Sequence, residues 1–208
     1  MKKFCRMLAI PIMLVLSGGV LADRADRFNV VDSSEPLEYG RLLLNFPSGW
    51  VKAPYHDQPL MRSILRTYLR ADAPTVRIDL ETQWKRGIEN ETGRRHAQFL
   101  PREYGDFVKA WLTWWMSPAG NSFNDVLVET GDFADHPGFK LTMEYTNPVG
   151  LEMKMVSVGA EEGDYLYWVT FHADTITNFD KYLGEFEQIV KTAKLRKMDC
   201  TFGIYLCN

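Results

Sequence analysis

The chain has 208 residues, a formal net charge of −3 and 46% hydrophobic residues. This composition is typical of a globular protein with its own core, and the acidic excess makes the chain poorly suited to binding a nucleic-acid backbone, which needs clustered Lys and Arg. Beyond the N-terminal segment, no apolar run reaches the length of about 20 residues that crossing a membrane requires.

The N-terminal segment has the order of a secretory signal peptide. Three basic residues are followed by the apolar run Leu8 to Leu16 and by small residues at the −3 and −1 positions of a cut after Ala22. We therefore expect cleavage of residues 1–22, a periplasmic location, and a mature chain 23–208 that forms a single α/β domain without a membrane anchor. The alternatives are an uncleaved N-terminal membrane anchor and a core helix that begins at residue 1.

The first elements of the mature chain are short. Leu42 to Phe46 predicts a strand that ends at the turn 47–49. The segment 61–70 has helical spacing of its apolar residues, yet it also fits one arm of a hairpin, since the turn 71–74 joins it to 75–81. Residues 75–81 alternate strictly between polar and apolar, which predicts a strand.

A long charged stretch, Lys85 to Arg102, predicts a loop, and Tyr104 to Met116 predicts an amphipathic helix. This helix carries Trp111, Trp114 and Trp115. Their spacing favours a core-facing stripe, while exposed tryptophans would instead be able to stack on sugar rings.

Four strands in series follow, at 125–130, 139–146, 151–158 and 165–172, with short links typical of an antiparallel meander. The segment Thr177 to Lys197 predicts a helix, with Thr177 and Asp180 spaced as in a capping box. An antiparallel sheet with an apolar face needs helices to cover it, so the pattern predicts an α+β fold.

Cys200 and Cys207 are the only cysteines of the mature chain. In an oxidising compartment two close cysteines predict a disulfide, which here would close the C-terminal tail, with a pair of free thiols as the alternative. Their spacing is not that of a redox or zinc site.

The order of these segments resembles the PsbP-like family, an α/β/α sandwich shared with Ran-binding nuclear import factors and with bacterial envelope proteins of unassigned function. The resemblance covers roughly residues 40–195. It implies strands rather than a helix at 61–81, a fold used mostly for binding, and no catalytic residues to carry over. Its segments are Leu44-Asn-Phe-Pro-Ser-Gly-Trp50, Gly138-Phe-Lys-Leu-Thr-Met-Glu-Tyr-Thr146, Val156-Ser-Val-Gly159, Gly163-Asp-Tyr-Leu-Tyr-Trp-Val-Thr170, Phe179-Asp-Lys-Tyr182 and Phe186-Glu-Gln-Ile-Val190.

Two charged segments are candidate contact sites for a protein partner, because binding residues concentrate on loops held by a rigid scaffold. The first is the loop segment Arg94, Arg95 and His96. The second is the expected hairpin tip with Glu161, Glu162 and Asp164, where acidic groups would attract a basic partner. Solvated surface is the alternative for both.

The sequence carries no motif for a catalytic residue, a metal or a cofactor. His172, two residues from Asp174, is interpreted as a structural histidine, with a catalytic or ligand role as the alternative. The segment 132–138 around His136 is interpreted as a turn, with a calcium loop as the alternative.

Three functions remain open. The first is a non-enzymatic periplasmic protein that binds another protein, in its sharpest form an immunity protein that neutralises a secreted toxin. The second is a factor for assembly or maintenance of the cell envelope. The third is a small peptidoglycan- or carbohydrate-active hydrolase that would use a carboxylate pair, with Glu103 and Asp106 as the residues to test, and the tryptophan cluster.

Overall fold

A computed structural model describes residues 29–30, 36–53, 58–60, 63–85, 88 and 100–196. The predictions on the signal peptide 1–22, on Arg94, Arg95 and His96, and on Cys200 and Cys207 therefore lie outside the described residues. Within the described part of the chain, no helix combines the length and the apolar character needed to span a membrane.

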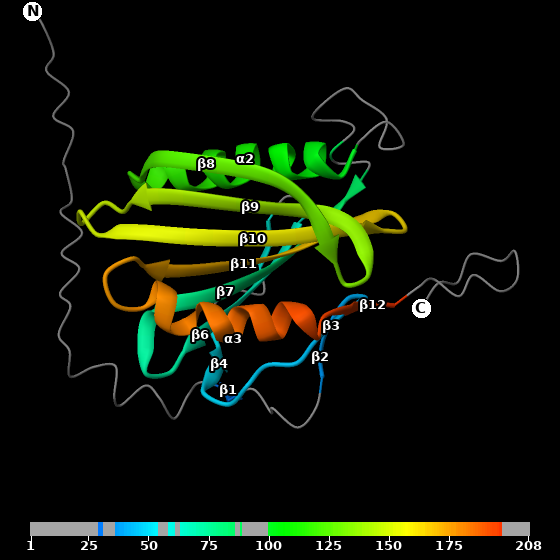
Figure 1. Ribbon diagram of the computed structural model, residues 1–208, viewed down its shortest axis with the longest axis horizontal. Coiled ribbons are helices and arrows are strands. Elements are labelled where there is room, and N and C mark those ends of the chain that lie inside the picture. The colour runs from blue at the N-terminus through cyan, green and yellow to red at the C-terminus, as the bar shows by residue number, and fades with distance from the viewer. Residues whose placement is uncertain are drawn as a thin grey trace, which may run out of the picture.

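Most of the described strands form one antiparallel sheet of nine strands (Figure 1). Their order is β1-β4-β6-β7-β11-β10-β9-β8, with β5 paired to β6. The bounds are β1 Asn29–Val30, β4 Trp50–Lys52, β5 Gln58–Leu60, β6 Ser63–Arg70, β7 Ala73–Trp84, β8 Ser122–Phe133, β9 His136–Thr146, β10 Glu152–Glu162 and β11 Tyr165–Asp174. A smaller sheet has the order β12-β3-β2, with β2 Leu37–Tyr39, β3 Leu42–Leu44 and β12 Lys194–Leu195.

The predicted meander is confirmed, and so is the hairpin at 61–81. Strands β8 to β11 follow one another and pair antiparallel. β6 pairs with β7, with Tyr68 opposite Ile78, so the helical spacing of 61–70 does not produce a helix. The tight turn before β9 uses Ala134 and Asp135 with positive φ, the backbone conformation of a two-residue hairpin turn.

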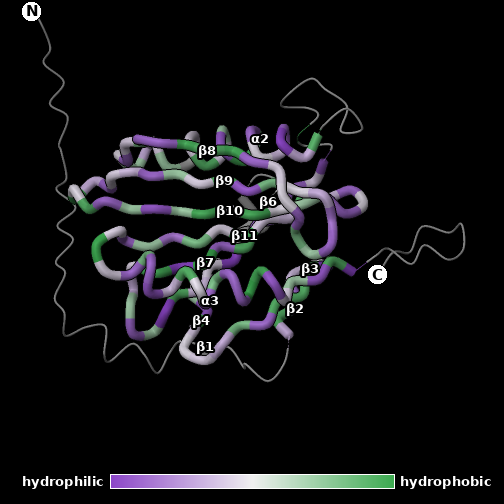
Figure 2. Tube along the Cα trace, in the orientation of Figure 1, coloured by the Kyte–Doolittle hydropathy of each residue, from purple (hydrophilic) through white to green (hydrophobic). Residues whose placement is uncertain are grey.

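Two long helices cover opposite faces and different halves of the sheet. Helix α2, Pro101–Met116, lies behind β8 and β9 in Figure 1 and continues into the short 3₁₀ helix η3, Ser117–Ala119. Helix α3, Phe179–Lys191, lies in front of β7 and β11. Figure 2 shows hydrophilic and hydrophobic residues alternating along α3, as expected for a helix with one face on the core. Among the described residues, no helix lies over the front of β8, β9 and β10.

The core therefore has two parts, one on each face of the sheet. Under α3, side chains such as Ile78, Val169 and Phe171 pack against Phe186 and Ile189. Under α2, the apolar side chains come from the other face of the same strands. They include Leu141, Met143, Met155, Trp168 and, from the helix, Tyr104, Val108 and Leu112.

Two expectations about α3 are wrong. The helix ends at Lys191 and not at Lys197, because Lys194 and Leu195 pair as β12 with β3. No capping box forms at its start. Asp174, at the end of β11, instead accepts hydrogen bonds from the backbone N–H (3.0 Å) and the hydroxyl (2.8 Å) of Thr177.

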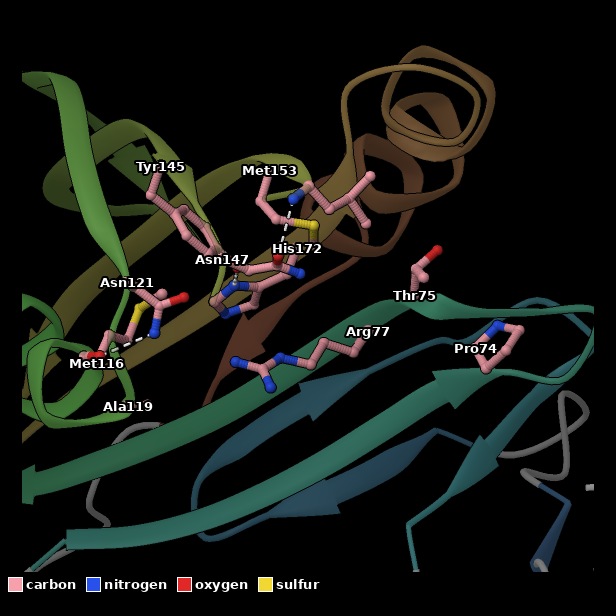
Figure 3. A pocket seen from close by; sticks show the side chains of 11 residues that line it. Pro74, Thr75, Arg77, Met116, Ala119, Asn121, Tyr145, Asn147, Met153 and His172 are labelled. Carbon is pink, nitrogen blue, oxygen red and sulfur yellow. Dashed lines mark hydrogen bonds between the residues drawn. The ribbon is translucent and has the colours of Figure 1, made fainter. Parts of the chain in front are cut away.

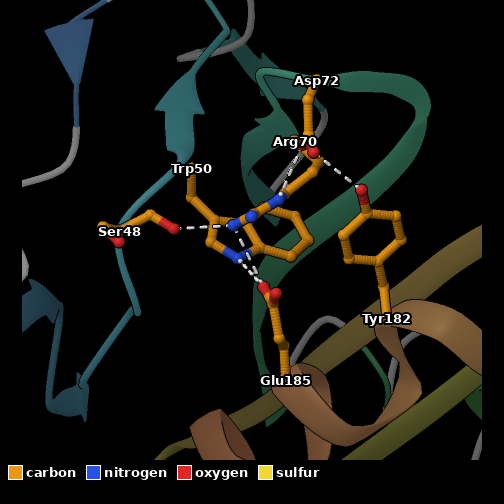
Figure 4. Close-up of polar contacts among 6 residues, drawn as sticks. All are labelled: Ser48, Trp50, Arg70, Asp72, Tyr182 and Glu185. Carbon is orange, nitrogen blue, oxygen red and sulfur yellow. Dashed lines mark hydrogen bonds and ion pairs between the residues drawn. The ribbon is translucent and has the colours of Figure 1, made fainter.

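A network around Arg70 fastens α3 to the edge of the sheet (Figure 4). The guanidinium of Arg70 donates to the carbonyl of Ser48 (2.6 Å), to Asp72 (2.9 Å) and to Glu185 of α3 (3.2 Å). The same Glu185 oxygen accepts the indole N–H of Trp50 at 3.0 Å. Asp72 in turn accepts the hydroxyl of Tyr182, so two side chains of α3 contact this network.

Candidate functional site

The acidic candidates lie at the end of β10 and in the turn that follows it. Glu161 accepts hydrogen bonds from the ammonium of Lys85 (3.1 Å) and from the hydroxyl of Tyr104. Glu162 lies 3.0 Å from Nε2 of His136 and 3.9 Å from Arg41. The fold thus brings Glu161 and Glu162 into one pocket of about 320 Å³ and satisfies both of them internally.

Asp164 lies apart from this pair. It is exposed in the β10–β11 turn, and its carbonyl accepts the backbone N–H of Lys85 at 2.8 Å. His136 belongs to β9, and its Nδ1 lies 2.7 Å from the carbonyl of Ala134. The segment 132–138 is therefore the end of one strand, a turn and the start of the next.

The tryptophans of α2 divide between interior and surface. The buried stripe of the helix is Tyr104, Val108, Leu112 and Met116. Trp111 lies beside it, partly buried, whereas Trp114 is 59% exposed and packs against Trp111 with ring centroids 5.4 Å apart. The expectation of a core role is thus wrong for Trp114. The side chain of Trp115 lies outside the described part.

The α2-facing side of the central strands carries a row of buried polar side chains that the sequence analysis did not predict. At its centre, Asp79 of β7 accepts the hydroxyl of Thr67 at 2.7 Å. Its other oxygen lies 3.1 Å from Nε of Arg77 and 3.1 Å from Nε2 of His172. On the neighbouring strands, Ser157 and Thr170 are hydrogen-bonded at 2.8 Å.

Burial and the neighbouring charges set the ionisation of the side chains in this row. Burial alone would raise the pKa of Asp79, but Arg77, His172 and Thr67 together hold it well below its usual range. Burial, with the nearby Arg77, lowers the pKa of His172, so its imidazole is neutral at physiological pH. The structural interpretation of His172 gains support from this contact, although its partner is Asp79 of β7 and not Asp174.

Glu81 is the next polar side chain in the row, and its pKa shifts in the opposite direction from that of Asp79. Burial, and then the negative charge of Asp79, raise the pKa of Glu81 to about 8. Its Oε2 accepts the indole N–H of Trp111 at 3.0 Å. Glu81 is therefore a protonated carboxylic acid at neutral pH, held beneath α2.

This polar row opens to solvent at one end of the sheet. A pocket of about 360 Å³ lies between the start of β7, the end of β11, the β9–β10 hairpin and η3 (Figure 3). Arg77, Tyr145 and His172 are among the residues that line it. Tyr145 lies with its hydroxyl 3.4 Å from Nδ1 of His172.

A second cavity, here called the α3 groove, lies on the opposite face, between α3 and the uncovered front of β9 and β10. Its volume is about 550 Å³. Its charged lining consists of Lys140, Lys154 and Lys191 together with Asp180 and Glu187. Its apolar lining consists of Val156, Val158, Phe179, Leu183, Phe186 and Val190.

Glu103 and Asp106, the residues of the hydrolase hypothesis, both lie in α2. Glu103 accepts the backbone N–H of Leu100 at 2.7 Å and so caps the start of α2. Asp106 is exposed on the next turn of the helix. Among the described residues, no three His, Cys, Asp or Glu side chains lie close enough together to hold a metal ion.

Comparison with known proteins finds similar folds among solved structures. No protein-family model matches the sequence, and no curated protein matches it either. Among solved structures, the cyanobacterial PsbP (CyanoP) of Synechocystis sp. PCC 6803 is similar with a TM-score of 0.52 and 10% identity, over 81% of this chain and 92% of that one.

Two further solved structures have lower scores. The Ran-binding protein Mog1p of Saccharomyces cerevisiae gives a TM-score of 0.48 at 10% identity, over 82% of this chain and 96% of that one. A structure from Bacteroides thetaiotaomicron VPI-5482 gives 0.44 at 11% identity, and 78% of this chain spans only 47% of its length.

The similarity to CyanoP and the arrangement of sheet and helices define the class of fold. The chain has a PsbP-like α+β fold, an antiparallel sheet with helices on both faces, as its sequence predicts. At 10% identity this similarity shows the fold alone, so function has to be argued from the sites.

Proposed function

We propose that this chain is an exported, non-enzymatic protein that acts by binding another protein in the α3 groove. In its sharpest form it is an immunity protein that binds and neutralises a secreted hydrolase acting in the periplasm. The observation that supports this proposal is the uncovered front of β8, β9 and β10 beside α3, with an apolar groove at its base.

The groove offers apolar surface that the fold itself leaves accessible. Leu183 and Val190 of α3 are only partly buried at its wall. On β8, Leu127 is 56% exposed and lies opposite Thr142, a residue of the groove, so it faces the same side of the sheet. Apolar side chains gathered on one open face are typical of a protein-binding surface.

The charges around the groove indicate the chemistry of the partner. Lys154 is shared between Glu144 (2.8 Å) and the ring of Phe179. Lys140 and Lys191 form no ion pair with any part of the chain that the structure describes. Asp180 and Glu187 also line the groove. The proposed partner segment therefore combines apolar side chains with acidic ones placed against Lys140 and Lys191. A hydrolase with paired catalytic carboxylates would supply such acidic groups.

The test is an affinity pull-down with the mature protein, residues 23–208, from periplasmic and secreted fractions. The variant Lys140→Glu/Lys191→Glu reverses both free charges. It should lose at least about tenfold in affinity for the recovered protein, since two favourable charge contacts become repulsive. Lys109→Glu, at an exposed position on α2 that forms no ion pair with the described residues, is the control and should bind as the original chain does.

The identity of the recovered protein decides between partner classes. A soluble hydrolase recovered at one-to-one ratio, and inhibited by the mature protein, would support the immunity function. Recovery of a membrane assembly would favour the envelope-factor alternative. Equal binding by the double variant and the control would contradict the groove as the binding surface.

A further inference from the structure

The pocket beside Arg77 lies on the other face of the sheet from the α3 groove and is independent of it. Tyr145, Met153 and His172 reach it from the α2-facing side of β9, β10 and β11. Met116 and Ala119 close it from the end of α2 and from η3. No residue that lines this pocket also lines the α3 groove.

Arg77 supplies a fixed positive charge at the pocket. Its Nε lies 3.1 Å from Oδ2 of Asp79, which holds the guanidinium from behind. Its side chain is nevertheless 42% exposed, and its two Nη groups have no acceptor among the described residues. Figure 3 shows the guanidinium beneath the ring of His172, with Met116 and Ala119 beyond it. A guanidinium held on one edge and free on the other is arranged to bind a planar anion.

Asn147 supplies a second set of free donors. Its Oδ1 accepts the backbone N–H groups of Val149 (3.1 Å) and Leu151 (2.9 Å) in the β9–β10 turn. Both bonds fix the orientation of the amide, because they require the oxygen and not the nitrogen at that position. The Nδ2 group is left without a partner in the described chain, and Asn147 lines the same pocket as Arg77.

The remaining polar groups of the pocket are neutral. Nε2 of His172 lies 3.1 Å from a carboxylate oxygen of Asp79, and its Nδ1 lies 3.4 Å from the hydroxyl of Tyr145. Arg77 is the cationic side chain among the described lining residues, and Asp79 offsets part of its charge. A singly charged anion is therefore better matched than a doubly charged one, which would need further cations.

The rest of the lining is apolar. Met116, Leu151 and Met153 provide apolar surface for a small hydrocarbon group. Pro74 lies at the other end of the pocket, away from the guanidinium (Figure 3). We infer that this pocket binds a small organic carboxylate, with Arg77 contacting the carboxylate, Asn147 donating a second hydrogen bond and the methionines packing against its apolar part.

The test is to titrate the mature protein with benzoate and with N-acetylalanine. Calorimetry and NMR chemical shifts are the readouts. Each is compared with its neutral amide, benzamide or N-acetylalanine amide, and with inorganic phosphate. We expect at least one carboxylate to bind one-to-one with a dissociation constant below about 1 mM, at least tenfold more tightly than its amide and than phosphate. The signals of Tyr145 and His172 should shift.

Two variants test whether the carboxylate binds in this pocket. Arg77→Lys keeps the charge but loses the planar fork and should weaken carboxylate binding at least about tenfold. Ala119→Trp leaves the polar row unchanged and fills the pocket from the exposed η3, so it should abolish binding in a protein that unfolds like the original.

The groove variant Lys140→Glu/Lys191→Glu should bind the carboxylate normally, which separates this inference from the protein-binding proposal. Failure of both carboxylates to bind, equal binding of the amides, tighter binding of phosphate, or full binding by the Ala119→Trp variant would each overturn the inference.

Discussion

The indole N–H of Trp111 donates a hydrogen bond of 3.0 Å to the buried carboxyl of Glu81, and so joins helix α2 to the central strand β7. The contact places a titratable group under a helix. Burial and the nearby Asp79 raise the pKa of Glu81 to about 8, compared with 4.5 for an ordinary glutamate. The folded protein therefore keeps a proton that the unfolded chain releases at neutral pH.

This difference predicts a pH dependence that Glu81→Gln removes. The unfolded chain ionises Glu81 above pH 4.5 and the folded chain only near pH 8, so the group lowers the free energy of unfolding as pH rises between these values. The loss is at most roughly 1.4 kcal/mol per pH unit. Urea unfolding at pH 5, 6.5 and 8 should show the free energy of unfolding of Glu81→Gln rising relative to that of the original chain as the pH increases.

Glu129→Gln is the control for this experiment, because Glu129 is exposed on β8. Its stability should follow that of the original chain at every pH. Parallel curves for Glu81→Gln and the original chain would show that Glu81 ionises normally in the fold.

The opposite behaviour is expected of Asp79. Replacing it with Asn removes the negative charge between Arg77 and His172 and should cost about 3 kcal/mol at pH 7. The folded pKa of Asp79 lies below its unfolded value of 3.8, so its contribution is present above that pH and is lost as the pH falls. The difference between variant and original in chemical unfolding should therefore shrink below about pH 3.8. A constant difference down to pH 2.5 would contradict this assignment.

The network that fastens α3 to the sheet depends on the shape of Arg70 more than on its charge. Its guanidinium donates to Ser48, Asp72 and Glu185 at once, and a lysine ammonium cannot span the three acceptors. Arg70→Lys should lower the free energy of unfolding by about 1–2 kcal/mol. Arg102→Lys on the exposed side of α2 should change it by less than about 0.5 kcal/mol, and an equal loss in both variants would argue against the network.

Two helical glycines should respond in opposite ways to the same substitution. A Cβ at Gly105 of α2 would lie 2.6 Å from Cγ1 of Val128 and 3.1 Å from Cβ of Phe139, so Gly105→Ala should destabilise by about 1–3 kcal/mol. At Gly184 of α3 a Cβ would meet nothing within 4 Å, and Gly184→Ala should stabilise by about 0.5–1 kcal/mol. Thermal unfolding of both variants checks the pair, and a gain at Gly105 would mean that α2 does not lie so close to β8.

The meander and both long helices could be predicted because their information is local. Strands such as β9 alternate residue by residue, and their turns carry their own glycine, proline or asparagine. The end of α3 could not be predicted in the same way. Apolar spacing continues to Leu195, but that residue belongs to β12, whose partner β3 lies far away in the sequence at Leu42–Leu44.

The buried polar row could not be predicted, because it depends on which strands are neighbours. The alternation at 75–81 suggests that Arg77, Asp79 and Glu81 face solvent, as they would on a strand with one open face. β7 instead lies in the middle of the sheet, where β11 places His172 opposite Arg77. A polar side chain on a central strand then becomes a buried one.

The open front of the sheet has a consequence for how this protein changes over evolutionary time. Along β9, Phe139, Leu141 and Met143 belong to the core under α2, whereas Lys140 and Thr142 project from the opposite side into the α3 groove. Substitutions at the second set alter the groove without disturbing the packing made by the first. A lineage whose partner keeps changing its contact residues could follow it by exchanging every second side chain of one strand, with little cost to stability.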